Sequence, residues 1–163
     1  MLSVDSPCES GSDLRVEITA VILKRHVRLD TRSNMNKTIA LSTLALIAYM
    51  AIIFYLSSLP GDLPSGIEIL AIPRIIMHVG EYTVLGLLAS SLAMQATGKG
   101  SKSILYSSIF SLLYGVTDEI HQYFVPTRCF DVYDICADAV GGILGSVLFI
   151  ILLMLARKRV ASL

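Results

Sequence analysis

Four long apolar runs set the limits on what this chain can fold into. They are Thr38–Ser58, Ile75–Ala96, Ser103–Gln122 and Val132–Ala156. Each is close to the roughly 20 residues that an α-helix needs to cross a bilayer. Of the 163 residues 54% are hydrophobic and only 16% are charged, which excludes an ordinary soluble domain. The sequence therefore predicts an all-α integral membrane bundle of four transmembrane helices, joined by short Pro- and Gly-containing loops that make neighbouring helices antiparallel.

Residues 1–36 differ in character from the rest, because they are polar and of mixed charge. We expect them to form a disordered cytoplasmic tail, and residues 37–159 to form the transmembrane domain. Met35, which is followed by Asn and Lys directly before the first apolar run, is a second candidate for the start of translation. The first run is longer than the core of a signal peptide and lacks a clear cleavage site, so we expect it to remain as an anchor.

The distribution of Lys and Arg predicts the orientation of the bundle in the membrane. Six of the 13 lie in residues 1–37, two lie between the second and third runs, and three follow the fourth run. Arg74 and Arg128 stand on the other side. Because cytoplasmic segments keep the excess of positive charge, both termini should be cytoplasmic and the loops 59–74 and 123–131 should face outward. The chain is thus predicted to be a multi-pass protein of the cell membrane.

Small residues at intervals of four predict where two helices pack closely, because helices in lipid associate through contacts at small side chains. The two stripes are Ser107, Ser111 and Gly115 in the third run, and Ala137, Gly141 and Gly145 in the fourth. We expect the third and fourth helices to touch along these faces.

Polar residues interrupt the apolar runs at their outward ends. They are His78, Glu81, Tyr82, Asp118, Glu119, Gln122, Arg128, Asp131, Asp134 and Asp138. Antiparallel helices would bring these side chains to one outer-leaflet layer in which acids outnumber bases. Two interpretations remain open: a closed network of ion pairs that fixes the bundle, or a pocket whose acids are separated by solvent or a ligand.

Several other site types have weak support or none. Clustered carboxylates attract hard cations, and His78 with Glu81 would make a mixed pair, but no H-E-x-x-H or comparable spacing occurs, so we assign no metal and no cofactor. Cys8, Cys129 and Cys136 show no metal-ligand spacing either. Basic clusters with interleaved aromatic residues are lacking, which argues against nucleic acid as a partner.

The order of residues around the third loop resembles that of the VanZ-like membrane family, named for an accessory protein of glycopeptide (teicoplanin) resistance. The resemblance covers about Lys37 to Ala156 and is most specific in residues 118–145, where DEIHQ is followed by P-x-R, then by three aspartates and GG-x-x-G. It implies a four-helix membrane protein linked to the cell envelope. Two positions depart from the family pattern, since Ile75 replaces a lysine and Asp138 replaces an asparagine.

The leading functional hypothesis is a binding protein. Its polar pocket would hold a lipid headgroup, a lipid-linked envelope precursor or an amphiphilic antibiotic such as a glycopeptide, with Arg128 as the anchor for phosphate or carboxylate. Two alternatives stay open. One is an intramembrane enzyme that acts on a lipid-linked substrate, either with a carboxylate and His78 as acid and base or with a metal ion, and the other is a structural membrane subunit without a ligand.

Overall fold

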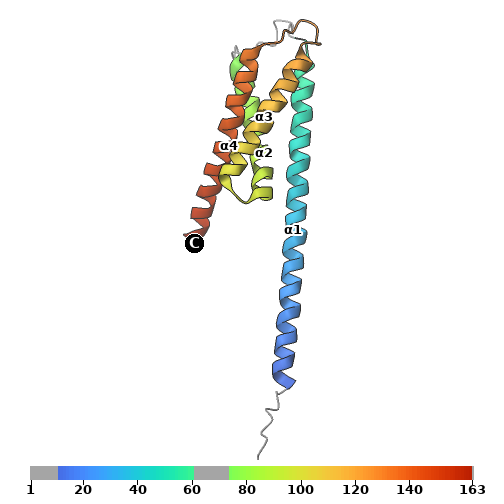
Figure 1. Cartoon of the computed structure of the whole chain (residues 1–163), viewed down its shortest axis with the longest axis vertical. Coiled ribbons are helices and arrows are strands. Elements are labelled where there is room, and N and C mark those ends of the chain that lie inside the picture. The colour runs from blue at the N-terminus through green and yellow to red at the C-terminus, as the bar shows by residue number, and fades with distance from the viewer. Residues whose placement is uncertain (1–10, 61–73, 163) are drawn as a thin grey trace, which may run out of the picture. The chain divides into compact units, whose positions relative to one another are not determined.

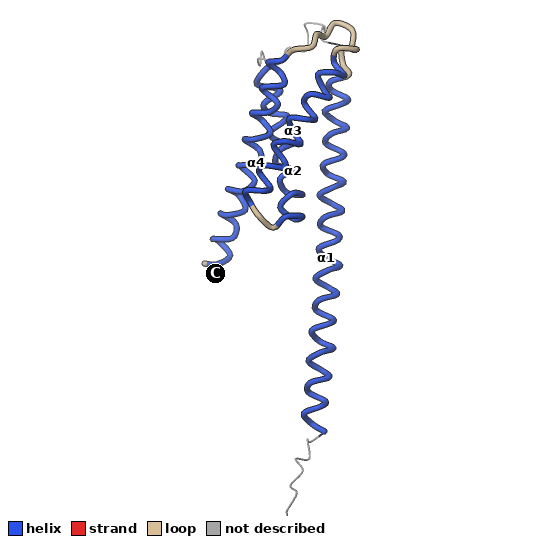
Figure 2. Tube along the Cα trace, in the orientation of Figure 1, coloured by secondary structure: helices blue, strands red, loops and turns tan. Residues whose placement is uncertain are grey.

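The chain is almost entirely helical in the part that the computed structural model describes, residues 11–60 and 74–162 (Figure 2). No β-strand occurs in those two stretches. The helices, labelled in Figure 1, are α1 (Gly11–Ser57), α2 (Arg74–Thr97), α3 (Gly100–Gln122) and α4 (Val132–Ala161). Each coincides with or contains one apolar run, give or take a residue. The prediction of an all-α fold with four helices is confirmed.

Some predictions concern residues outside the described part. These are the loop expected between the first two helices, most of which is residues 61–73, and the first ten residues of the tail with Cys8. The outward placement of that loop remains a prediction.

Helix α1 begins much earlier than the first apolar run. Residues 11–36 are helical, whereas the sequence predicted a disordered tail there. The physical reason is that no Gly or Pro occurs from Ser12 to Ser58, so nothing in this stretch breaks the backbone hydrogen bonding. The chain divides into two compact units, Met1–Ala40 and Leu41–Leu163. In the first unit nearly all described side chains are exposed, so helix propensity rather than packing accounts for this segment.

In the second unit α2, α3 and α4 all pack against one another (Figure 1). A two-residue turn joins α2 to α3 and makes them antiparallel. Gly98 adopts a φ of 63°, the left-handed conformation that glycine accepts without strain, and its N–H donates to the Met94 carbonyl at 2.9 Å. This is the usual way for glycine to end a helix.

Glycines on two faces of α4 allow close approach to both neighbours. A Cβ added at Gly145 would lie 1.9 Å from the Thr83 carbonyl oxygen of α2, and one at Gly141 would lie 2.5 Å from the Val79 carbonyl oxygen. A Cβ on Gly142, one position round the helix, would instead meet Ser111 of α3 at 2.3 Å.

The predicted stripe of Gly141 and Gly145 was therefore assigned to the wrong partner. It faces α2, whereas α3 meets α4 at Gly142 and at Gly115, whose added Cβ would lie 2.8 Å from the Asp138 carboxylate. The spacing identifies a face on which the backbone can come close, but it does not identify the helix that fills it. Contact between α3 and α4 was predicted correctly.

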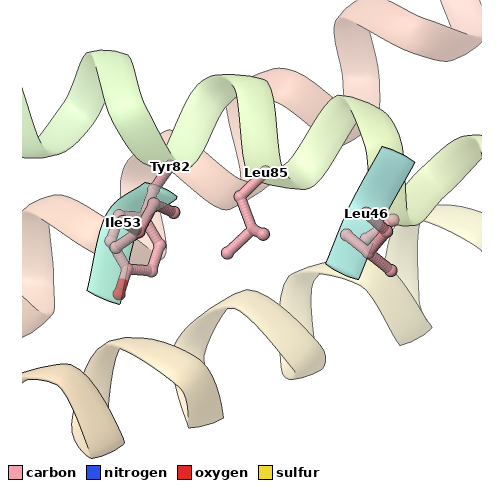
Figure 3. Close-up of a cluster of buried hydrophobic side chains, with 5 residues drawn as sticks. Leu46, Ile53, Tyr82 and Leu85 are labelled. Atoms are coloured by element: carbon pink, nitrogen blue, oxygen red, sulfur yellow. The ribbon is translucent and has the colours of Figure 1, made fainter. Parts of the chain in front are cut away.

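A small hydrophobic core lies between α1 and α2 in the second unit (Figure 3). Its buried members are Leu46, Ile53, Tyr82, Leu85 and Ala89. Two tyrosine hydroxyls also form hydrogen bonds between α1 and its neighbours. Tyr49 donates its hydroxyl to the Glu81 carbonyl at 3.0 Å, and Tyr114 donates to the Met50 carbonyl at 2.7 Å. These bonds attach the second half of α1 to α2 and α3.

The interior of the described structure is more polar than its surface. Twelve polar or charged side chains are buried there against seven hydrophobic ones, while large apolar side chains such as Ile143 and Leu152 are exposed. Water would favour the reverse distribution. Three helices are long and apolar enough to cross a membrane by length and composition: Val21–Ser57 within α1, α2, and α4. The distribution is typical of a protein solvated by lipid, and a membrane crossing by the more polar α3 remains a prediction.

Because α4 lies so close to α2, adding a single methyl group at Gly145 should have a large effect on stability. Gly145→Ala should lower the free energy of unfolding in detergent by about 2 kcal/mol or more, because the helices must separate to admit the Cβ. Thermal unfolding followed by circular dichroism measures this.

Gly80→Ala is the matched control, since no atom lies within 4 Å of a Cβ there. It should be neutral, or should stabilise by up to about 1 kcal/mol through helix propensity. Equal melting of the two variants would contradict the packing described for α2 and α4.

Candidate functional site

The buried polar residues gather where α2 begins, α3 ends and α4 begins. Because the three helices alternate in direction, these ends meet at one end of the bundle. The buried side chains there are His78, Asp118, Glu119, Gln122, Asp134 and Asp138. Burial of so many charged groups requires a partner for each of them.

His78 of α2 lies between two aspartates of α4. Its Nδ1 is 2.9 Å from Asp138 Oδ1, and its Nε2 is 3.5 Å from Asp134 Oδ2. Asp134 and Asp138 are four residues apart, so they share one face of α4. Because an ionised carboxylate can only accept, Nδ1–H of His78 donates to Asp138, and Nε2 faces Asp134.

Gln122 at the end of α3 connects an acid with two arginines. Its Nε2 donates to Asp118 Oδ2 at 2.9 Å, one turn earlier on the same helix. Its Oε1 accepts from Arg128 Nη1 at 3.0 Å and from Arg74 Nη2 at 3.3 Å. Arg74 also forms an ion pair with Asp134 while its side chain remains 47% exposed. The amide thus holds two guanidinium groups side by side at the end of the bundle.

Arg128 is held by neutral acceptors. Besides Gln122, its Nε donates to the Leu59 carbonyl at 2.9 Å and its Nη2 to the Leu56 carbonyl at 3.3 Å. None of the ion pairs among the described residues involves Arg128. The preceding Thr127 has a φ of 66°, which is costly for a β-branched residue. The backbone is therefore held in an unfavourable conformation next to an arginine whose charge no carboxylate pairs directly.

Glu119 is fully buried and only half of its carboxylate is hydrogen-bonded. Oε2 accepts from the backbone N–H of Asp131 at 2.9 Å, and Oε1 has no hydrogen-bond partner among the described residues. Asp131 itself is the N-cap of α4, where its Oδ1 accepts from the Tyr133 N–H at 2.9 Å. Glu119 thereby fixes the loop that leads into α4 and keeps one oxygen free inside the bundle.

Three of these residues are close enough to share a ligand. His78, Glu119 and Asp134 each offer one ligand atom, and the three atoms lie within 4.8 Å of one another. The mixed pair that the sequence suggested, His78 with Glu81, is not this group. The third helix supplies the glutamate instead.

Comparison with known proteins identifies the family. A model of the family described as VanZ/LLP1 matches residues 21–153, most of the chain. The chain belongs to the VanZ/LLP1 family. The resemblance seen in the sequence is therefore confirmed. Neither a curated protein nor a solved structure matches the chain significantly.

Two predicted site residues of this VanZ/LLP1 chain take no part in the hydrogen bonds and ion pairs of the cluster. Tyr82 packs its ring in the hydrophobic core, 6.3 Å from the ring of Tyr114, and its hydroxyl has no hydrogen-bond partner among the described residues. Glu81 is half-buried, and its carboxylate forms no hydrogen bond or ion pair with the described residues. The remaining predicted residues come together, and a ligand-binding role for them stays a prediction.

Sequence reasoning underrated two features of the VanZ/LLP1 chain. Arg74 was counted among the bases but not among the site residues, although it pairs with Asp134. Serines on three helices form buried hydrogen bonds farther from the end of the bundle that holds the cluster. The hydroxyl oxygens of Ser90 and Ser103 are 2.8 Å apart, and those of Ser107 and Ser146 are 2.6 Å apart. The spacing of Ser103 and Ser107 was a usable signal, but serine can also bond to its own helix, as Ser107 does to the Ser103 carbonyl at 2.6 Å.

Gln122→Leu tests the role of the amide that joins Asp118 to the arginines. The substitution leaves a buried carboxylate without its donor and two guanidinium groups without a shared acceptor, so the free energy of unfolding should fall by about 2–4 kcal/mol. Chemical unfolding in detergent micelles measures it.

Gln95→Leu is the matched control, because Gln95 is a partly buried glutamine that donates to the neutral Ser42 hydroxyl at 2.8 Å. Its loss should cost about 1 kcal/mol. A control as damaging as Gln122→Leu would mean that the charges around Gln122 contribute nothing.

Proposed function

We propose that this VanZ/LLP1-family chain is a membrane binding protein that holds the anionic headgroup of an amphiphile at the rim formed by Arg74 and Arg128. The amphiphile would be a membrane phospholipid, a lipid-linked envelope precursor or an amphiphilic antibiotic such as teicoplanin. The single observation that carries the proposal is that the Gln122 amide oxygen accepts from both guanidinium groups.

Paired guanidinium groups suit phosphate and carboxylate. Arginine presents parallel N–H donors that match two oxygens of such a group. Two arginines already held together bind it with little further loss of side-chain conformational entropy. Arg128 already has its orientation fixed by two carbonyls of the preceding chain. Arg74 is about half exposed, which leaves part of its guanidinium accessible to a headgroup.

The acids behind the arginines limit how deep such a headgroup can go. Asp118, Glu119, Asp134 and Asp138 are all buried and outnumber the cations beside them, so an anion that passed the rim would meet an excess of negative charge. The headgroup should therefore stay at the helix ends, while its apolar chains lie along the exposed apolar faces of the helices. Repulsion by the buried acids and attraction by the two arginines together fix the depth at which the headgroup binds.

The proposal includes a topology in which all four helices cross the membrane, both termini are cytoplasmic and the polar cluster lies in the outer leaflet. The excess of Lys and Arg in the segments assigned to the cytoplasm supports it.

A reporter enzyme fused after Leu163 should be active in the cytoplasm, and a reporter inserted near Gly66 should be active outside. Paired fusions with cytoplasm-specific and export-specific reporters measure this. The reverse pattern would place the cluster at the inner leaflet and would contradict the proposed access from outside.

Binding is tested directly on detergent-purified protein. Native mass spectrometry detects co-purified lipid, and titration with phosphatidylglycerol, a polyprenyl diphosphate and teicoplanin separates the three sources of the anionic group. At least one should bind, and Arg128→Gln should weaken that binding about tenfold or more. Arg157→Gln is the control, since Arg157 is an exposed arginine near the end of α4, away from the cluster.

The stability of the same variants separates binding from scaffolding. Arg128→Gln and Glu119→Gln should remain folded and lose binding or the envelope phenotype. If both variants unfold and none of the three probes binds the parent protein, the cluster is a structural network without a ligand and the proposal fails.

A second candidate function rests on the contact between His78 and Asp138. A carboxylate that accepts from Nδ1–H fixes the imidazole tautomer and leaves Nε2 as a base, an arrangement that hydrolases use. Turnover of a polyprenyl diphosphate probe by the parent protein, with loss of phosphate release in His78→Gln and retained binding of the probe, would favour an intramembrane enzyme over a binding protein.

A further inference from the structure

We propose that His78, Glu119 and Asp134 form a binding site for one divalent cation of the first transition row, of the zinc type. The three residues come from three different helices, and each side chain is at least nine-tenths buried. Their ligand atoms already lie within 4.8 Å of one another. This site lies beside the headgroup site and shares Arg74 with it, but it uses other ligand atoms and does not require that a headgroup binds.

The distances suit such an ion. A metal with ligand bonds of about 2.0–2.2 Å holds neighbouring tetrahedral ligand atoms roughly 3.3–3.6 Å apart. His78 Nε2 and Asp134 Oδ2 are 3.5 Å apart, so a small inward movement of Glu119 would complete three ligand positions. Imidazole together with two carboxylates favours zinc, manganese or iron over magnesium and calcium, which prefer oxygen ligands alone.

A second observation points to a missing ligand. Glu119 Oε1 is a buried carboxylate oxygen without a hydrogen-bond partner among the described residues, although Oε2 of the same group is held by the Asp131 N–H. A buried acceptor of this kind costs free energy unless a proton, a water or a cation meets it. A cation between His78 and Asp134 would meet it.

His78 also has the hydrogen bond to a carboxylate that metal-binding histidines usually form through their second ring nitrogen. Asp138 Oδ1 accepts from Nδ1–H of His78 at 2.9 Å, which orients the ring so that Nε2 faces Asp134 and can bind a cation in the neutral imidazole. A carboxylate behind a histidine in this manner fixes the tautomer and raises the basicity of the ligand nitrogen. Asp138 is thus a positioning residue for the proposed ion.

Arg74 is the competitor for the site. Its guanidinium forms an ion pair with Asp134, so it neutralises one of the proposed ligands. The same nitrogen lies 3.3 Å from Gln122 Oε1, which gives Arg74 an alternative acceptor when a cation binds Asp134. Arg74→Gln should therefore strengthen the binding of the ion, whereas removal of a purely structural ion pair would only destabilise the protein.

The test uses zinc on the full-length protein in detergent, stripped with a chelator and then dialysed against zinc. Elemental analysis should find about one zinc per chain, and bound zinc should raise the melting temperature. Glu119→Gln and Asp134→Asn should lose this zinc, Asp138→Asn should weaken its binding roughly tenfold, and Arg74→Gln should tighten its binding. Less than a tenth of a zinc per chain in the parent protein would overturn the proposal.

Two control variants exclude binding at the surface. His26→Gln removes an exposed histidine of α1, and Cys136→Ser removes an exposed thiol two residues from Asp134. Neither should change the zinc content, and loss of zinc in Cys136→Ser with retention in Glu119→Gln would also overturn the proposal.

If the acid variants fail to fold, the site is tested by adding cobalt in place of zinc to the parent protein. An absorption spectrum of nitrogen and oxygen ligands without thiolate charge transfer supports the site. A thiolate band, or no cobalt spectrum at all, contradicts it.

Discussion

The hydrogen bond between His78 on α2 and Asp138 on α4 joins two fully or nearly fully buried groups, and much of the polar cluster depends on it. Without His78, Asp134 and Asp138 would face each other across one turn of α4 with Arg74 as their only close cation among the described residues. Acids this deeply buried are tolerated only when partners are present and correctly oriented. The rest of the bundle is arranged so that this partner is within reach.

Close backbone packing supplies that reach. Glycines let α4 approach α2 at Gly141 and Gly145 and approach α3 at Gly142. The three helices are therefore close enough for short side chains such as Asp and His to bond across them. Larger residues on α4 would move Asp134 and Asp138 away from His78. In a bundle whose surface is apolar, association rests on such contacts and on buried hydrogen bonds, because lipid gives no hydrophobic drive between helices.

The two proposals assign different parts of the cluster to different ligands. The arginines at the helix ends suit an anionic headgroup, and the histidine with two acids below them suits a cation. The two sites share Arg74, whose guanidinium lies beside both Asp134 and Gln122. Occupancy of one site should therefore alter the charge available at the other.

The sequence by itself determined the helical fold, the number of helices, the approximate bounds of the last three and the family, because each depends on local composition or on a short motif. It also placed the acids, His78 and Gln122 at one end of the bundle, since the loops are short and helices must then alternate. It erred on residues 11–36, where the polar composition suggested disorder although no residue breaks the helix. It gave Gly141 and Gly145 to α3 instead of α2. The tertiary structure decided that partner, the core position of Tyr82 and the grouping of Glu119 with His78, because these depend on how each helix is rotated about its axis. A four-residue spacing defines a face of a helix but leaves open which neighbour that face meets.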